Sequence, residues 1–404
     1  MRRRGHTKSR RGCVQCKLRH VKCDEGRPAC SLCTVSARQC SFMSEAPADS
    51  PSSSSLSRRR SLAGISTSSV TPRETSTLLS DTSRALYSPT PEGLLNLRHI
   101  HLLVHLTSSK DIFDFGATPH RASENSAALA LALQKGLQDT YLLYQLLAFS
   151  ARHLACLHPS QSETYLEQAI ALQTHGVSLF NVAQLSQVDR SNCVSFLIYS
   201  GILGHHLLAD ALSFRDQPID EFLAEYAWCA RLHRGVRTIA ASSWPLLMES
   251  ELTGMLSWSQ EYLLRKPTGQ ECSRIRVMVA TSASLTGGER QACMEAIDFL
   301  QVGFDSVLSA DWEELGKEAG SKGNKHQMTY SWSVVVAPEF MALLVDKRPE
   351  SLVVLGYFCV LLHYARETWQ IRDAGRYVFE MVEQCLGEAW RCWLDWPRRM
   401  IASD

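Results

Sequence analysis

Residues 12–40 read GCVQCKLRHVKCDEGRPACSLCTVSARQC and contain two copies of the spacing C-x2-C-x6-C. About forty residues cannot bury enough apolar surface to fold alone, so this segment needs a metal or cross-links. Zinc takes four ligands and favours thiolates, and two zinc ions would need eight bonds from six sulfur atoms, two of which must then bridge both ions. The spacing therefore predicts a two-zinc cluster held by Cys13, Cys16, Cys23, Cys30, Cys33 and Cys40.

Three disulfides are the alternative use of six cysteines in a small domain. The chain begins MRRRGHTKSRRG, which is charged and lacks the apolar stretch of a secretory signal. We therefore expect a reducing compartment, in which cysteines serve as metal ligands or as small buried side chains.

Charge is distributed very unevenly along the 404 residues, although the formal net charge is only +1. Residues 1–43 hold eleven Lys or Arg against two acidic residues, a net charge of +9. Residues 44–90 carry +1, which leaves −9 on residues 91–404. A short basic head of this kind is typical of a nucleic-acid-binding protein, while a nuclear-import signal or a membrane-surface tether is the alternative.

The head resembles the fungal binuclear zinc-cluster (Zn2Cys6) DNA-binding domain in its six cysteines, in the basic run before Cys23 and in Pro28. The resemblance implies two zinc ions bridged by Cys13 and Cys30, and double-stranded DNA as the partner. It also implies a nuclear transcription factor that regulates RNA polymerase II transcription from a CGG-like element. The first helix of such domains enters the major groove, which assigns base contacts to Lys17, Arg19, His20 and Lys22.

The chemistry of these four residues agrees with that assignment. They occupy little more than one helical turn between two cysteines, and Lys or Arg can pair with guanine O6 and N7. His20 stands where many members of the family carry Lys or Arg, but a histidine can still donate to a guanine acceptor. The flanking Arg10 and Arg11 are expected to contact phosphates, which adds affinity but little sequence information.

Residues 44–90 form the predicted linker. They contain fifteen Ser and six Thr among 47 positions, a composition that cannot offset the entropy of ordering and predicts disorder. No sustained heptad pattern of a coiled coil occurs there. A homodimer, if one forms, would therefore use the remainder of the chain.

Residues 91–404 are predicted to form one all-α domain, a bundle of antiparallel helices. TYLLYQLLAFSARHLACLHP (140–159) has a wide apolar face that ends at a proline, and 196–212 and 351–365 are apolar nearly all round. No run of about 18 uninterrupted apolar residues occurs, so no membrane span is expected. Residues 266–289 and 311–329 are the predicted loops.

The helical body carries no sequence motif of a hydrolase, metalloprotease or nucleotide-binding enzyme, so we expect no enzymatic role. His205, His206 and Asp210 could be imagined as a metal site, but adjacent histidines point to different helix faces, so core packing is favoured. The eight cysteines outside the head lack paired spacing and are expected to be small buried side chains.

The body also resembles the fungal-specific regulatory domain of zinc-cluster factors related to sterol uptake control proteins, through residues 142–155, 165–180, 348–379 and 388–397. That resemblance implies a helical bundle with an apolar pocket, hence a small apolar ligand or a protein partner. The tryptophans in the last part, Trp369, Trp390, Trp393 and Trp396, are expected to pack in the core rather than to contact a ligand.

Two other functions remain possible from the sequence. One is a ligand sensor or interaction scaffold whose zinc head only localises it to DNA or to the nucleus. The other is a helical enzyme with an appended zinc head, which the missing catalytic motifs disfavour.

Overall fold

The computed structural model describes residues 13–18, 23, 25, 30, 40–44, 96–113, 122–183, 188–213, 215, 217–308 and 324–403. Contacts between residues divide the chain into two units, Met1–Ser88 and Pro89–Asp404. We call the first unit the head and the second the body, and describe each by itself. Most of the predicted linker, 44–90, lies outside the described residues.

The head contains helix α1 (Val14–Leu18) and the 3-10 helix η1 (Ser41–Ser44). The described cysteines of the head are buried together, and Phe42 packs against them. No disulfide joins the cysteines among the described residues, which disfavours the three-disulfide alternative. Among the described residues of the head, the buried cluster therefore consists of cysteines, with Phe42 packed against it.

The described residues of the body form helices joined by turns and loops, with no strand among them, so the predicted all-α class is confirmed. Its helices are α4 (Leu97–Ser108), α5 (Ala122–Gln138), α6 (Thr140–Leu157), η3 (Pro159–Gln161), α7 (Ser162–Ala183), α8 (Cys193–Ser213), α9 (Ile219–Ser242), α10 (Trp244–Met248), α11 (Thr253–Leu263), α12 (Ser273–Thr281), α13 (Gly287–Val307), α15 (Gln327–Val335), α16 (Pro338–Val345), α17 (Pro349–Tyr364), α18 (Ala374–Leu386), η4 (Glu388–Leu394) and α19 (Asp395–Ala402).

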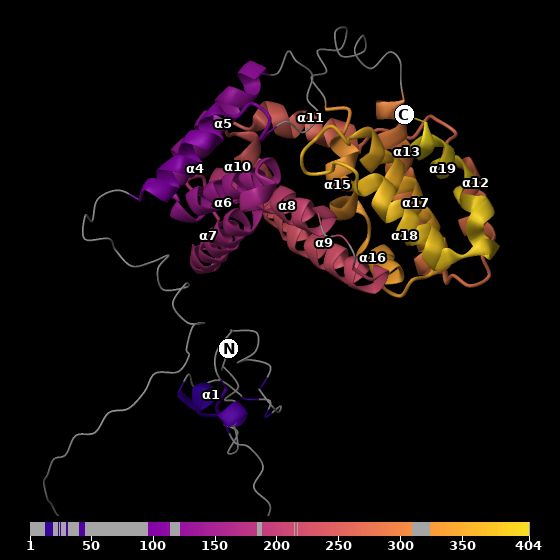
Figure 1. Cartoon of the computed structure of the whole chain (residues 1–404), viewed down its shortest axis with the longest axis horizontal. Helices are drawn as coiled ribbons and strands as arrows, with labels where there is room; N and C mark the ends of the chain where they lie inside the picture. Colours follow the sequence, from indigo (N-terminus) through magenta and orange to yellow (C-terminus); the bar gives the residue numbers. More distant parts are fainter. Residues whose placement is uncertain are drawn as a thin grey trace, which may run out of the picture. The chain divides into compact units, whose positions relative to one another are not determined.

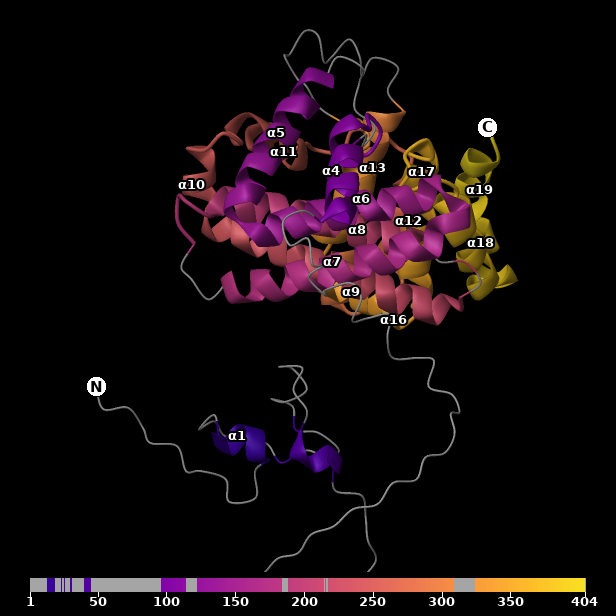
Figure 2. The same ribbon diagram turned by 60° about the vertical axis from the view of Figure 1, so that its left-hand side comes forward.

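Within the body, α4 to α7 gather at one end and α12 to α19 at the other, with the paired helices α8 and α9 between them (Figure 1). The view turned by 60° shows α6 and α7 lying side by side (Figure 2). They are connected by η3, which begins at Pro159, two residues after α6 ends at Leu157. Proline lacks the N–H needed to continue a helix, so the chain turns there.

The largest core cluster surrounds α17, which is buried on nearly every side. Trp332 from α15 stacks on Phe358 of α17 with ring centroids 4.4 Å apart, and its indole N–H donates to the carbonyl of Ala296 at 3.0 Å. A central helix with neighbours all round must be apolar all round, which is why residues 351–365 carry no polar stripe.

Helix α8 is long and apolar enough to cross a membrane by length and composition, and so is the bent pair α15 and α16 if counted as one span. In the body, 67% of the apolar window of α8 is buried against other helices. Burial of this kind is typical of a core helix, and it accounts for the apolar composition of 196–212.

Two expectations for the body were wrong in part. The predicted loop 266–289 contains α12, whose Ile275, Met278 and Val279 form one buried face at helical spacing. The eight body cysteines are not all buried, because Cys156 is half-buried and two more, Cys385 and Cys392, are exposed on α18 and η4. Most of the second predicted loop, 311–329, lies outside the described residues, and its last three residues belong to α15.

Candidate zinc centre and nucleic-acid interface

Four cysteine side chains of the head point their sulfur atoms at one another. Every pair of Sγ atoms among Cys13, Cys16, Cys23 and Cys30 lies within 4.8 Å, and each of these residues is at most 3% exposed. They come from three separate places in the chain: the start of α1, and two positions beyond it. The sequence repeat therefore folds into a compact sulfur cage.

The distances within the cage fit a tetrahedral zinc ion. The Sγ of Cys30 lies 3.6 Å from that of Cys13 and 3.7 Å from that of Cys16. A zinc ion with bonds of about 2.3 Å to four sulfurs would hold those sulfurs about 3.8 Å apart. The residues present are thus the right type, number and spacing for one complete site.

Backbone groups hold the sulfurs in place. Helix α1 starts immediately after Cys13, whose carbonyl accepts the first helical bond from the Lys17 N–H at 3.1 Å. The Cys13 sulfur accepts from the Cys16 N–H at 3.4 Å, as a serine oxygen does at a helix N-cap. The Cys23 sulfur accepts two N–H groups, from Cys13 and from Glu25, both at 3.4 Å.

Burial affects the Cys16 thiol of the cage. Burial and the neighbouring Cys13 thiol raise the pKa of Cys16 to about 12. Zinc binds the thiolate form of cysteine, so metal binding at this site displaces the thiol proton. When zinc binds, it supplies the positive charge, and the cage supplies the sulfur ligands.

Comparison with known proteins identifies the head. Residues 11–49 match the fungal Zn(2)-Cys(6) binuclear cluster domain. That match covers the sulfur cage and α1. Residues 11–49 of the head are a fungal Zn(2)-Cys(6) binuclear cluster domain. A domain of this kind binds two zinc ions, and the four clustered thiols provide ligands for them.

Two of three similar proteins are transcription factors by name, and the third is named for the control of sterol uptake. A Zn(2)-C6 fungal-type transcription factor of Gibberella zeae is 21% identical over all of this chain and 87% of its own length. Sterol uptake control protein 2 of Saccharomyces cerevisiae is 52% identical over 40 residues, which are 10% of this chain and 4% of that protein. Transcription factor lfc1 of Flammulina velutipes is 31% identical over 21% of this chain and 28% of its own length. No solved structure matches this chain.

These comparisons support a DNA-binding transcription regulator and imply a role other than catalysis. The likeness to the sterol uptake control protein is limited to 40 residues, and sterol-control relatives match in the N-terminal region. The resemblance of the body to their regulatory domain therefore stays a prediction.

The structure places only some of the predicted site residues. Cys40 is buried with the four caged cysteines, and Lys17 is exposed on α1. The remaining candidates, Cys33, Arg10, Arg11, Arg19, His20 and Lys22, lie outside the described residues. Their roles stay predictions.

The structure adds two residues to the head that the sequence reasoning missed. The Ser41 hydroxyl oxygen accepts a hydrogen bond from the Val14 N–H at 3.0 Å, across 27 positions of sequence. Phe42 packs on the cysteine cluster. Their position directly after Cys40 was the only signal in the sequence.

In the body, His205 and His206 turn to different neighbours, as expected. The Nδ1 of His206 accepts a hydrogen bond from the Gln145 side-chain amide at 3.2 Å, and its Nε2 lies 3.6 Å from a carboxylate oxygen of Asp210. His205 instead faces the ring of Tyr330, with centroids 5.0 Å apart. Among the described residues, no group of three metal-ligating side chains forms in the body.

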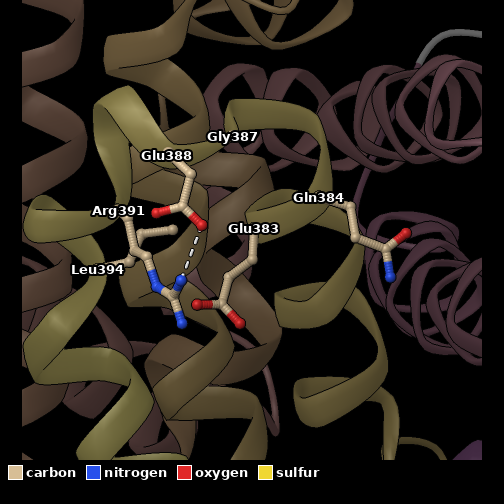
Figure 3. A pocket seen from close by; sticks show the side chains of 6 residues that line it. All are labelled: Glu383, Gln384, Gly387, Glu388, Arg391 and Leu394. Carbon is tan, nitrogen blue, oxygen red and sulfur yellow. Dashed lines mark hydrogen bonds and ion pairs between the residues drawn. The ribbon is translucent and has the colours of Figure 1, made fainter.

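A pocket of about 300 Å³ lies at the junction of α18 and η4 (Figure 3). Three charged side chains, Glu383, Glu388 and Arg391, are part of its lining, and Arg391 donates to the Glu388 carboxylate at 2.8 Å. Glu383 points toward the same arginine (Figure 3). This charged lining does not suit the small apolar ligand expected for the body.

Proposed function

We propose that the chain is a nuclear, sequence-specific regulator of RNA polymerase II transcription that binds a GC-containing, CGG-like element through its zinc head. The observation that carries the proposal is the sulfur cage, in which Cys13 directly precedes α1 and Cys16 lies within that helix. A rigid helix with an exposed Lys17 presents a cation at a defined position, as base recognition requires.

The proposed contacts divide into two classes. Lys17, Arg19, His20 and Lys22 read base edges in the major groove, while Arg10 and Arg11 contact phosphates. We further propose that Cys13 and Cys30 bridge the two zinc ions and that all six cysteines are ligands. The 3.6 Å distance between the two proposed bridging sulfurs supports that arrangement.

The body is proposed to regulate the head's activity by binding a small apolar ligand or a protein partner, and to form any homodimer. Its net charge of −9 supports a separate task, because an acidic surface is repelled by DNA. The absence of catalytic sequence motifs supports a non-enzymatic role.

The experiment that tests the function is selection of duplexes from a random pool by the full-length, zinc-loaded chain. Recovery of a CGG-like element is expected, and its half-site spacing would report any dimer. Recovery of no consensus sequence would favour the alternative function, a ligand sensor or interaction scaffold whose zinc head only localises it to DNA or to the nucleus. A protein with that function needs no specific base contacts.

Two substitutions then separate base contacts from phosphate contacts. Lys22→Ala should weaken binding to the selected duplex by roughly 1–3 kcal/mol and leave binding to a scrambled duplex nearly unchanged. Arg10→Ala should weaken both alike and reduce the slope of log K against log salt by about 0.9. Unchanged discrimination in Lys22→Ala would remove that residue from the set that reads bases.

A further inference from the structure

Helix α1 is too short to be stable on its own. It has five residues, and the first turn of any helix leaves N–H groups without helical partners. Nucleating a helix costs free energy, and one turn recovers little of it. Contacts from outside the helix must therefore decide its orientation.

Two such contacts occur at the start of α1, and they differ in origin. The Cys13 sulfur, inside the metal cage, accepts the Cys16 N–H. The Ser41 oxygen, beyond the last cysteine, accepts the Val14 N–H at 3.0 Å. The helix start is thus held at one point by a zinc ligand and at another by a residue that ligates no metal.

The neighbouring residue holds Ser41 in position. Phe42 is half-buried and packs against the caged cysteines, and both residues belong to η1. Because Phe42 is packed against the cysteines, the backbone of the adjacent Ser41 has little freedom to move away from α1. The hydroxyl oxygen is therefore presented to α1 at a fixed place.

We infer that Ser41 is a positioning residue for DNA reading, which sets the start of α1 and hence the place of Lys17. Lys17 follows Val14 by three residues, close to one helical turn, so a shift of the helix start displaces the lysine amine. The inference rests on the proposed function, because it assigns Ser41 a role in base recognition through the helix and not through contact with DNA.

The test compares the full-length chain with Ser41→Ala and Ser41→Thr. Ser41→Ala removes the acceptor oxygen, whereas Ser41→Thr keeps it. Ser213→Ala is the matched control, because it removes a hydroxyl group from the end of α8 in the body, where Ser213 bonds the Asp210 carbonyl. Each protein is measured for zinc per chain and for affinity to the selected and scrambled duplexes.

Ser41→Ala is expected to keep two zinc ions and to lose about fivefold in affinity for the selected duplex, since an N-cap oxygen contributes roughly 1 kcal/mol. Affinity for the scrambled duplex should stay within twofold, because phosphate contacts do not depend on the exact place of α1. Ser41→Thr and Ser213→Ala should both retain the discrimination of the wild-type chain.

Three results would overturn the inference. Unchanged discrimination in Ser41→Ala, with the wild-type chain selective, would refute the positioning role and leave the proposed function intact. Loss of zinc in Ser41→Ala would assign Ser41 to the stability of the metal site instead. A wild-type chain that discriminates between no duplexes would remove both the proposed function and the inference.

Discussion

Cys30 brings the two copies of the cysteine repeat together. Its sulfur is completely buried and lies within 3.7 Å of two other sulfurs, one at each end of the first turn of α1. It comes from the second copy of the cysteine repeat, whereas Cys13 and Cys16 come from the first. Cys30 therefore joins the two copies through the metal centre rather than through a hydrophobic contact.

A chain in which Cys30 is replaced should therefore bind fewer zinc ions than a chain in which Cys16 is replaced. If Cys30 bridges both ions, Cys30→Ala removes a ligand from each of them, while Cys16→Ala removes one ligand from one ion. We expect the purified Cys30→Ala chain to hold less than one zinc ion and the Cys16→Ala chain to hold about one. A metallochromic dye after thiol modification measures the zinc released per chain.

Cys385→Ala is the control for this measurement, because that cysteine is exposed on α18. It should retain the zinc content of the wild-type chain. Equal zinc loss in Cys30→Ala and Cys16→Ala would contradict the bridging role.

At the scale of elements, close packing of α17 against α18 depends on a residue without a side chain. A Cβ added at Gly375 of α18 would lie 2.6 Å from the His363 backbone nitrogen and 2.7 Å from the Cys359 carbonyl oxygen of α17. Real Cβ atoms do not approach backbone atoms so closely. The two helices can be neighbours at this distance only because position 375 is glycine.

Gly375→Ala should destabilise the body by about 1–3 kcal/mol, since the helices must move apart. Gly235 provides the matched control: it lies in α9, and a Cβ there would meet nothing within 4 Å. Gly235→Ala should be neutral or should stabilise the body by up to about 1 kcal/mol, because alanine favours a helix. Urea unfolding followed by tryptophan fluorescence compares the two. Equal effects would show that α17 and α18 do not approach as closely as described.

A pair of histidines joins α4 to α6. The Nε2 of His105 lies 3.1 Å from the Nδ1 of His153, so one nitrogen donates a proton and the other accepts it. Burial, and then the neighbouring His105, lower the pKa of His153 to about 4, and burial, followed by repulsion from His101 and His158, lowers the pKa of His105. Both rings are therefore neutral in the folded body at pH 7.

Histidines with a lowered pKa should make the body less stable to unfolding as the pH falls from 6.5 to about 4. In this interval the unfolded chain takes up protons that the folded chain does not, so the free energy of unfolding falls as the pH falls. Each histidine of lowered pKa contributes a slope of up to about 1.4 kcal/mol per pH unit. His153→Gln keeps a hydrogen-bonding side chain but does not titrate, so it should reduce this slope.

Urea unfolding at pH 7.5, 6 and 5 measures the slope in both chains. His175→Gln is the comparison variant, because His175 also packs on an aromatic ring, that of Tyr144, but lies outside the histidine pair. A slope that is unchanged in His153→Gln would show that this histidine titrates normally in the folded body.

The sequence could predict the helices of the body but not their partners. Periodicity placed α6, α8 and α17 within a few residues of their observed bounds, because apolar faces repeat at helical spacing. It missed α12, whose Arg274 and Arg276 interrupt the apolar residues and made the segment resemble a loop. Short helices with few apolar positions carry a weak periodic signal.

Tryptophans that are close in sequence show what periodicity cannot provide. Trp369 packs on Phe149, with centroids 5.1 Å apart, and donates to the Ile112 carbonyl at 3.1 Å, both of them at the α4–α7 end of the body. Trp396 instead stacks on Tyr357, in the main core around α17, with centroids 5.1 Å apart. Trp369 and Trp396 both pack in a hydrophobic core. Which of the two cores each tryptophan belongs to depends on tertiary contacts, which sequence spacing alone does not encode.

At the scale of the whole molecule, the head could be predicted more completely than the body. Metal ligands must occur at nearly fixed spacing because the ion dictates their geometry, so Cys13, Cys16, Cys23 and Cys30 were found together as expected. The Ser41 contact could not be predicted, since serine follows cysteine in many sequences and its partner lies 27 residues away. A near-neutral net charge of +1 likewise hides a basic head and an acidic body.

Because contacts divide the chain into two units, zinc removal should affect only one of them. Zinc binding supplies folding free energy to a head whose described buried residues are cysteines, so a chelator should unfold the head and abolish specific DNA binding. The body has a large hydrophobic core, and its described residues form no metal site. Its unfolding midpoint in urea should therefore stay the same with and without the chelator.

The distribution of tryptophan makes this measurement selective: all nine tryptophans lie at or after residue 228, so intrinsic fluorescence reports on the body alone. Chelation followed by fluorescence-detected unfolding should give the same midpoint as the zinc-loaded chain, while anisotropy of a labelled duplex reports complete loss of binding. Restoring zinc should restore the binding, because the body has remained folded. A fluorescence midpoint that falls on chelation would mean that the stability of the body depends on the zinc head, and the division of the chain into two independent units would then be wrong.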